Sequence, residues 1–137
     1  MVRLLGMLGG RHTPDTEFLE LRVYRPGEFT VYLPRFQGKN RNRFSIAHVL
    51  GHYFVHYRAP RLDGEKTFHR EECQGRVNVE ANLFAVGMLL PEEKFRLAWE
   101  SSGGNVWHLA GLFEVAPAMV RHHGEVLGLK KASGDRS

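Results

Sequence analysis

The chain has 137 residues, enough for one domain that buries a core of its own without disulfide bonds. Hydrophobic residues make up 42% and charged residues 25%, a globular composition that excludes a fibrous or low-complexity protein. The single cysteine, Cys73, excludes an intramolecular disulfide and fits a reducing cytosol. No apolar run approaches the roughly 20 residues that span a bilayer, and MVRLLGMLGG is too short and too weakly apolar for a secretory signal. We expect a cytoplasmic protein without a membrane segment.

The charge balance is basic, with a net charge of +4 and a pI near 9.5. A basic surface can bind nucleic acid because neutralised phosphates release counterions. Here the basic residues are scattered, with one loose group between residues 35 and 43 and Lys130 and Lys131 near the C-terminus. This pattern is typical of a solvated surface, so we do not expect direct binding to nucleic acid.

Residues 17–34 (EFLELRVYRPGEFTVYLP) are typical of a β-hairpin. Apolar and polar residues alternate on both sides of a turn at Pro26 and Gly27, which is the period of a strand with one buried face. A polar, basic connector follows over residues 35–43. The alternating apolar residues are Leu19, Leu21, Val23, Phe29, Val31 and Leu33.

The helical spacing of apolar residues predicts α-helices over most of the remaining chain. Pro91 ends one helix and begins the next, with Glu92 and Glu93 in the first turn, where carboxylates interact favourably with the helix dipole. A Ser-Ser-Gly-Gly break ends that helix. The expected helices are residues 44–58, 77–90, a third from Pro91, 105–114 and 117–128, with a long loop or short irregular element over 60–75.

The order of these elements, two strands and then helices, predicts an α+β fold. We expect a β-hairpin or small sheet at the N-terminus, packed on a helical bundle. The whole is expected to form a single domain over residues 1–129, and the remaining residues 130–137 form a polar tail.

The segment His48-Val49-Leu50-Gly51-His52 carries the chemical signal. Two histidines at positions i and i+4 lie one above the other on a helix, so both imidazoles can reach one metal ion. Zinc peptidases hold their metal in this way with an H-E-x-x-H helix, in which the Glu is the general base. On its own a pair of histidines at this spacing is weak evidence in a chain with eight of them.

Three segments resemble, in order, the signatures of the ImmA/IrrE family of zinc metallopeptidases. RFSIAHVLGHYFVH resembles RF-S/T-x-A-H-E-L-G-H-x-x-x-H, and VEANLFAVGMLLPEE resembles E-x-x-A-N-x-F-A-x-x-L-L-x-P-E-E. LAGLFEVAPAMVRHHGEVLGL resembles L-A-x-x-F-x-V-S-x-x-x-V-x-x-R-L-x-x-L-G-L. Order and spacing agree over roughly residues 17–129.

The resemblance implies a zincin-like minimal domain and a cytoplasmic endopeptidase of bacteria or their mobile genetic elements. Such enzymes are commonly paired with a helix-turn-helix repressor, which they cleave. The resemblance places the metal on His48, His52 and a glutamate of the next helix, with a general-base glutamate directly after the first histidine.

This chain departs from the family pattern at two of these positions. Val49 stands where the general base is needed, and a hydrocarbon side chain cannot accept a proton. The ligand glutamate falls on Asn78, and a neutral amide is a poorer zinc ligand than a carboxylate. Glu80 is an alternative ligand, but two positions along a helix turn it about 200° away. We therefore expect zinc to bind weakly or not at all.

The other histidines have mostly structural interpretations. His56 continues the i+4 series, and packing or a hydrogen bond to a metal-binding histidine is expected. His69 and Cys73 are of types that suit zinc and precede the second helix, yet surface or packing roles are more common for such residues. We expect His122 and His123 at the surface.

The leading hypothesis is an ImmA/IrrE-like protein with impaired proteolysis that binds a partner, such as a helix-turn-helix repressor, by strand addition on the hairpin edge. One alternative is a working zinc endopeptidase that uses another base and a third ligand such as Glu80 or Cys73. Another is a DNA-binding regulator that uses its two C-terminal helices, although these fit packing as well.

Overall fold

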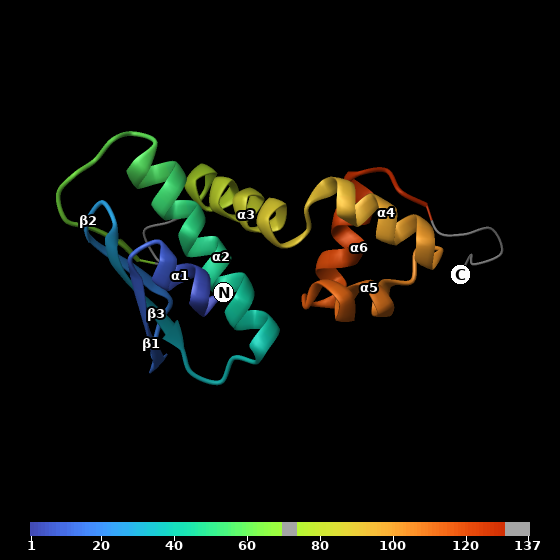
Figure 1. Cartoon of the computed structure of the whole chain (residues 1–137), viewed down its shortest axis with the longest axis horizontal. Helices are drawn as coiled ribbons and strands as arrows, with labels where there is room; N and C mark the ends of the chain where they lie inside the picture. Colours follow the sequence, from blue (N-terminus) through green and yellow to red (C-terminus); the bar gives the residue numbers. More distant parts are fainter. Residues whose placement is uncertain (70–73, 131–137) are drawn as a thin grey trace. The chain divides into compact units, whose positions relative to one another are not determined.

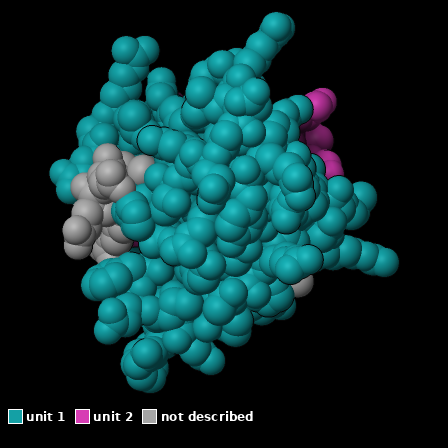
Figure 2. Space-filling view, turned by 90° about the vertical axis from the view of Figure 1, so that its left-hand side faces the viewer, with its two compact units in different colours: residues 1–85 teal, residues 86–137 magenta. Residues whose placement is uncertain are grey.

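The computed structural model describes residues 1–69 and 74–130, and it has an α+β fold, as predicted (Figure 1). Cys73 and the predicted tail after Lys130 lie outside the described residues. The chain divides into two compact units, residues 1–85 and 86–137, which Figure 2 distinguishes by colour. No helix among the described residues is long and apolar enough to cross a membrane.

A four-stranded sheet forms one layer of the first unit, in the order β1-β3-β2-β4. The predicted hairpin is confirmed: β2 and β3 are antiparallel and meet at a turn in which Gly27 has a φ of +81°. β1 adds to β3 in parallel, and β4 adds to β2 antiparallel. The hairpin edges on which we expected a partner strand to add are therefore both occupied. The strands are β1 (Gly10–Thr16), β2 (Glu20–Arg25), β3 (Glu28–Pro34) and β4 (Lys66–His69).

Three elements of the first unit were not predicted from the sequence, and a fourth begins earlier than predicted. The N-terminus carries a short helix, α1 (Val2–Met7), and the strand β1, while β4 lies inside the segment expected to be a loop or a short irregular element. The basic connector is also partly helical, because α2 (Lys39–Gly51) begins five residues before Phe44. β1, β4 and the connector are mainly polar, so no apolar alternation or helical period marks them, and the six residues of α1 are too few to show a helical period.

The long helix that carries the histidines changes its winding near its middle. α2 is followed without a break by η1 (His52–Arg58), a π-helical segment in which the amide of Ala59 donates to the carbonyl of Phe54, five residues earlier. Short π-helical insertions in α-helices are frequently found at functional sites. His48 therefore lies in the α-helical part and His52 at the start of the wider turn.

The core of the first unit lies between the sheet and this helix. The alternating apolar residues of β2 and β3 are buried, as the hairpin pattern predicted, and Thr30 of β3 is buried as well. The ring of Phe29 lies 4.4 Å from that of Tyr53. Tyr53 Oη accepts a hydrogen bond of 2.8 Å from the amide of Gly27 and so ties the helix to the hairpin turn. The buried residues include Leu21, Val23, Phe29, Val31, Leu33, Ile46, Leu50 and Tyr57.

The second unit contains the helices α4 (Glu92–Ser102), α5 (Val106–Phe113) and α6 (Pro117–Val126), close to the predicted bounds. α4 ends at Gly103 in the left-handed conformation, with φ +66°, and α6 has its proline in the first turn. Phe95 and Trp99 pack in its core with Leu109, Val115 and Val120. The C-terminal helices thus use their apolar residues to bury a core.

Candidate metal centre

A small pocket of about 30 Å³ opens beside the two histidines of the long helix. This volume accommodates a group of about the size of a water molecule. The sheet side contributes Phe68 and His69, and α3 (Arg76–Leu89) contributes Asn78. The lining residues are Leu19, His48, Val49, His52, Phe68, His69 and Asn78.

The imidazoles of His48 and His52 converge within this pocket. Their Nε2 atoms lie 3.2 Å apart, and the ring planes are nearly perpendicular, at 85°. Zinc–nitrogen bonds of about 2.0–2.1 Å in a tetrahedral site imply an N–N separation of roughly 3.3 Å. The pair is therefore spaced to bind two adjacent positions of one metal ion.

Each of the two imidazoles also has a hydrogen-bond partner at its other ring nitrogen, Nδ1. His48 Nδ1 lies 2.7 Å from Asn82 Oδ1, an acceptor on α3. His52 Nδ1 lies 3.0 Å from His56 Nδ1, and His56 Nε2 lies 2.9 Å from Glu80 Oε1. Metal-binding histidines usually carry such a partner on the second nitrogen. The sequence named Glu80 only as an alternative zinc ligand, and neither its contact with His56 nor that of Asn82 with His48 follows from the helix pattern, because both depend on how α3 packs against the histidine helix.

Burial keeps the histidine pair uncharged. His52 is 2% exposed and its ring stacks on Phe68 at 5.4 Å. This burial, with smaller contributions from the neighbouring imidazoles, lowers the pKa of His52 to about 3. Burial also lowers the pKa of His48, although the hydrogen bond with Asn82 acts in the opposite direction. Both rings are thus neutral near pH 7, which is the form that binds a metal ion.

Val49 and Asn78 line the same pocket as the two histidines. Val49 is 2% exposed, so hydrocarbon occupies the wall next to His48. Asn78 is one α-helical turn from Asn82, and the two share a face of α3. Glu80 does not line the pocket, because its carboxylate is directed to His56 and, at 3.4 Å, to Arg76. The hydrogen bond from His56 lowers the pKa of Glu80, which keeps this carboxylate ionised.

The residues fit a metal ion only in part. Two neutral imidazoles with converging Nε2 atoms suit zinc. Within residues 1–69 and 74–130, however, no group of three or more His, Cys, Asp or Glu side chains could hold a metal ion. The amide of Asn78 is the polar side chain that the second helix adds to the pocket. The described site thus offers two converging imidazoles and no anionic ligand.

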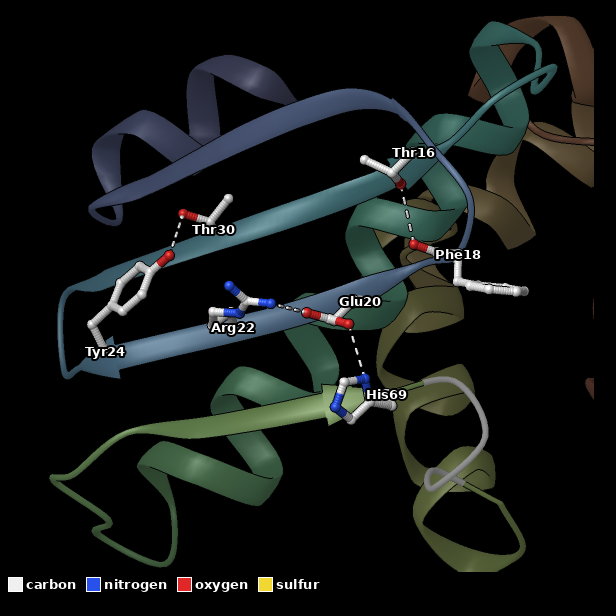
Figure 3. Close-up of polar contacts among 7 residues, drawn as sticks. All are labelled: Thr16, Phe18, Glu20, Arg22, Tyr24, Thr30 and His69. Carbon is white, nitrogen blue, oxygen red and sulfur yellow. Dashed lines mark hydrogen bonds and ion pairs between the residues drawn. The ribbon is translucent and has the colours of Figure 1, made fainter.

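A carboxylate and a histidine pair at the sheet edge of the pocket (Figure 3). Glu20 on β2 and His69 on β4 are directly opposite in the antiparallel register, and Glu20 Oε1 lies 2.9 Å from His69 Nδ1. The other carboxylate oxygen of Glu20 accepts from Arg22 at 2.9 Å. The sequence suggested His69 as a metal ligand, but it gave no sign of Glu20, because β4 was not predicted as a strand.

Comparison with known proteins agrees with this geometry. The sequence profile of the Peptidase M78 family, described as the IrrE N-terminal-like domain, matches residues 14–123. No curated protein sequence matches the chain. The matched region contains the histidine helix, the pocket and most of the second unit, and it covers well over half of the chain. The chain therefore belongs to the IrrE N-terminal-like family of metallopeptidase-fold proteins.

Proposed function

We propose that this protein binds a protein partner at the histidine pocket and hydrolyses it poorly or not at all. The observation that carries the proposal is Val49, which is buried and lines the pocket beside His48. A metallopeptidase needs a base there to orient and deprotonate water, and loss of a general base typically costs about 10²–10⁴ in rate. The alkyl side chain of Val49 can do neither.

Asn78 supports the same conclusion from the metal side. It lines the pocket at the position where the family resemblance places the anionic ligand. Without that charge, two imidazoles compete weakly with water and chelators for zinc. We expect substoichiometric zinc that a chelator removes easily. The pocket would then serve to bind the partner protein and not to hydrolyse it.

The partner that we propose is a helix-turn-helix repressor, which presents an extended segment to the sheet. Strand addition gives main-chain hydrogen bonds, and pockets for alternate side chains give specificity. β4 is the outer strand on the pocket side of the sheet, and it carries the pocket residues Phe68 and His69. An added strand at β4 would therefore run beside the pocket.

The proposal is tested by zinc affinity and by cleavage of a co-encoded repressor, with casein as a general substrate. The parent, Val49→Glu, Asn78→Glu and the double variant are compared, and Val79→Glu serves as a matched control because Val79 is a neighbouring, 54% exposed residue of α3. We expect no cleavage by the parent and higher zinc affinity in Asn78→Glu and the double variant only. The base and the ligand should act non-additively on any restored cleavage. Robust, chelator-sensitive cleavage by the parent would refute the proposal.

A second candidate function is an active peptidase with a different base, and the pairing of Glu20 with His69 is the observation that favours it. A histidine whose Nδ1–H donates to a carboxylate is oriented as in general-base catalysis. His69 lines the pocket together with His48 and His52. If this candidate is correct, the parent cleaves its partner and both His69→Gln and Glu20→Gln abolish cleavage, whereas Val49→Ala leaves it unchanged.

A further inference from the structure

A chain of polar contacts runs from the surface of α3 to the histidine pocket. Arg76 Nε lies 3.4 Å from Glu80 Oε2, and Glu80 Oε1 lies 2.9 Å from His56 Nε2. His56 Nδ1 lies 3.0 Å from His52 Nδ1, and His52 Nε2 lies 3.2 Å from His48 Nε2. The Asn82 amide oxygen closes the other end, on His48 Nδ1.

Glu80 and Asn82, the hydrogen-bond partners at the two ends of this series of contacts, determine which nitrogen of each imidazole carries the hydrogen. A neutral imidazole has one N–H donor and one acceptor nitrogen. The ionised carboxylate of Glu80 only accepts, so a neutral imidazole at His56 carries its hydrogen on Nε2 and accepts at Nδ1. His52 must then donate from Nδ1, which leaves a lone pair on its Nε2. At the other end, the Asn82 oxygen accepts from His48 Nδ1, and this leaves a lone pair on His48 Nε2.

The two lone pairs therefore face each other across 3.2 Å. Two acceptor nitrogens at this distance repel, and a cation between them removes the repulsion. The opposite tautomer of His52 would donate a hydrogen bond from Nε2 to His48 Nε2. Neither Nε2 atom would then have a lone pair available to bind a cation. Which of the two forms is present depends on the partner of His56, because the hydrogen bond of His52 Nδ1 is with His56 Nδ1.

We propose that Glu80 and His56 are a positioning pair, which holds the hydrogen of His52 on Nδ1 and so keeps its Nε2 lone pair available to a divalent cation. Glu80 then acts on the site through two imidazoles instead of binding the ion itself. The inference rests on the proposed function only in taking the pocket of His48 and His52 as the functional site.

The test substitutes Glu80→Gln in the full chain and reads the histidine tautomers directly. A glutamine amide can donate or accept, so it no longer fixes the hydrogen of His56. Long-range proton–nitrogen NMR spectra of the metal-free protein, at a pH where the rings are neutral, distinguish Nδ1–H from Nε2–H. We expect His52 to be the Nδ1–H form in the parent and to populate the Nε2–H form in Glu80→Gln. Zinc affinity, measured by competition with a chromophoric chelator, should fall about 10–100-fold.

Arg76→Gln is the matched control. It also removes one charge from this face of α3, but Glu80 Oε1 stays on His56, so the tautomer of His52 should not change. Three outcomes overturn the proposal: the parent tautomer persists in Glu80→Gln, Arg76→Gln has the same effect as Glu80→Gln, or the tautomer changes without any loss of zinc affinity. The spectra identify the tautomer of His52 even where zinc binding is too weak to compare between variants. They involve no catalysis, so cleavage by the parent would refute the proposed function and leave this result standing.

Discussion

Gly51 leaves no room for a side chain between the histidine helix and α3. A Cβ atom at this position would lie 2.9 Å from the carbonyl oxygen of Ala81 and 3.1 Å from Cβ of Phe84. Because a backbone atom is the nearest obstacle, relief requires the two helices to separate. This close approach is what brings Asn82 and Glu80 to the histidines.

We expect Gly51→Ala to destabilise the protein by about 1–3 kcal/mol, the usual range for overpacking. The measurement is equilibrium unfolding in urea. Gly87→Ala is the matched control, because Gly87 lies in α3 with nothing within 4 Å of a Cβ atom. That variant should gain up to about 1 kcal/mol from helix propensity. Equal stabilities for the two variants would show that the helices are not in close contact at Gly51.

His123 is a second residue whose environment predicts a measurable effect. We expected it at the surface, but its ring packs 4.8 Å from that of Phe95, and its Nε2 atom is buried without a hydrogen-bond partner among the described residues. Burial lowers the pKa of His123. The neighbouring His122 is exposed, as predicted.

The lowered pKa of His123 makes part of the stability depend on pH. As the pH falls below about 6.5, the unfolded state binds a proton before the folded state does, so stability is lost as the pH falls towards the folded pKa. We expect His123→Phe to lose less stability than the parent between pH 7.5 and pH 5, in thermal unfolding followed by circular dichroism. His122→Gln should behave like the parent. Parallel pH profiles for His123→Phe and the parent would contradict the assignment.

The residues of the pocket differ in how far the sequence could predict them. His48 and His52 follow from their spacing along one helix and Asn78 from the family resemblance, and the structure brings all three to one pocket with Val49. The partners do not follow from spacing. Glu80 meets His56 only because α3 packs on η1, and Glu20 meets His69 only because β4 pairs with β2. Contacts between elements depend on tertiary packing, which one-dimensional periodicity does not contain.

The same distinction holds for whole elements. The hairpin and the helices with an apolar face were predictable, because burial of one face imposes a period. β1 was not, since five consecutive residues of it are exposed and Pro14 interrupts it. The π-helical winding of η1 was not predictable either, because the apolar residues of this segment follow the spacing of an ordinary α-helix.

Helix α5 begins with a capping interaction that can be tested by itself. Asn105 precedes the helix, and its Oδ1 accepts a hydrogen bond of 3.0 Å from the amide of His108. We expect Asn105→Ala to cost about 1 kcal/mol of unfolding free energy, and Asn105→Ser to retain most of the stability, because serine also caps helices well. Urea unfolding of both variants is the measurement. A loss as large for serine as for alanine would mean that the capping hydrogen bond is not the source of the loss.

For the whole molecule, the prediction of a single domain over residues 1–129 has a direct test. Both tryptophans, Trp99 and Trp107, lie in the second unit, so their fluorescence reports on residues 86–137 alone. Far-UV circular dichroism reports on both units. Since α3 passes from one unit into the other, unfolding of either unit releases part of this helix.

We therefore expect the denaturation curves from fluorescence and circular dichroism to coincide, as is usual for domains of fewer than 150 residues. Curves with separate midpoints would show two domains that unfold independently. In that case the stability effects of Gly51→Ala and of Asn105→Ala should each appear in only one of the two transitions.

The order of the strands has a consequence for how the molecule behaves at high concentration. An exposed sheet edge is a template for aggregation, and proteins protect such edges with proline, with charge and with very short strands. The outer strand β1 contains Pro14, which cannot donate a backbone hydrogen bond, and charged Arg11 and Asp15. The other outer strand, β4, has four described residues and begins with Lys66. Edge-to-edge stacking into a fibril needs both outer strands of the sheet. The protection of β1 should therefore keep copies of this chain from stacking, although the short β4 can still pair with one strand of a partner.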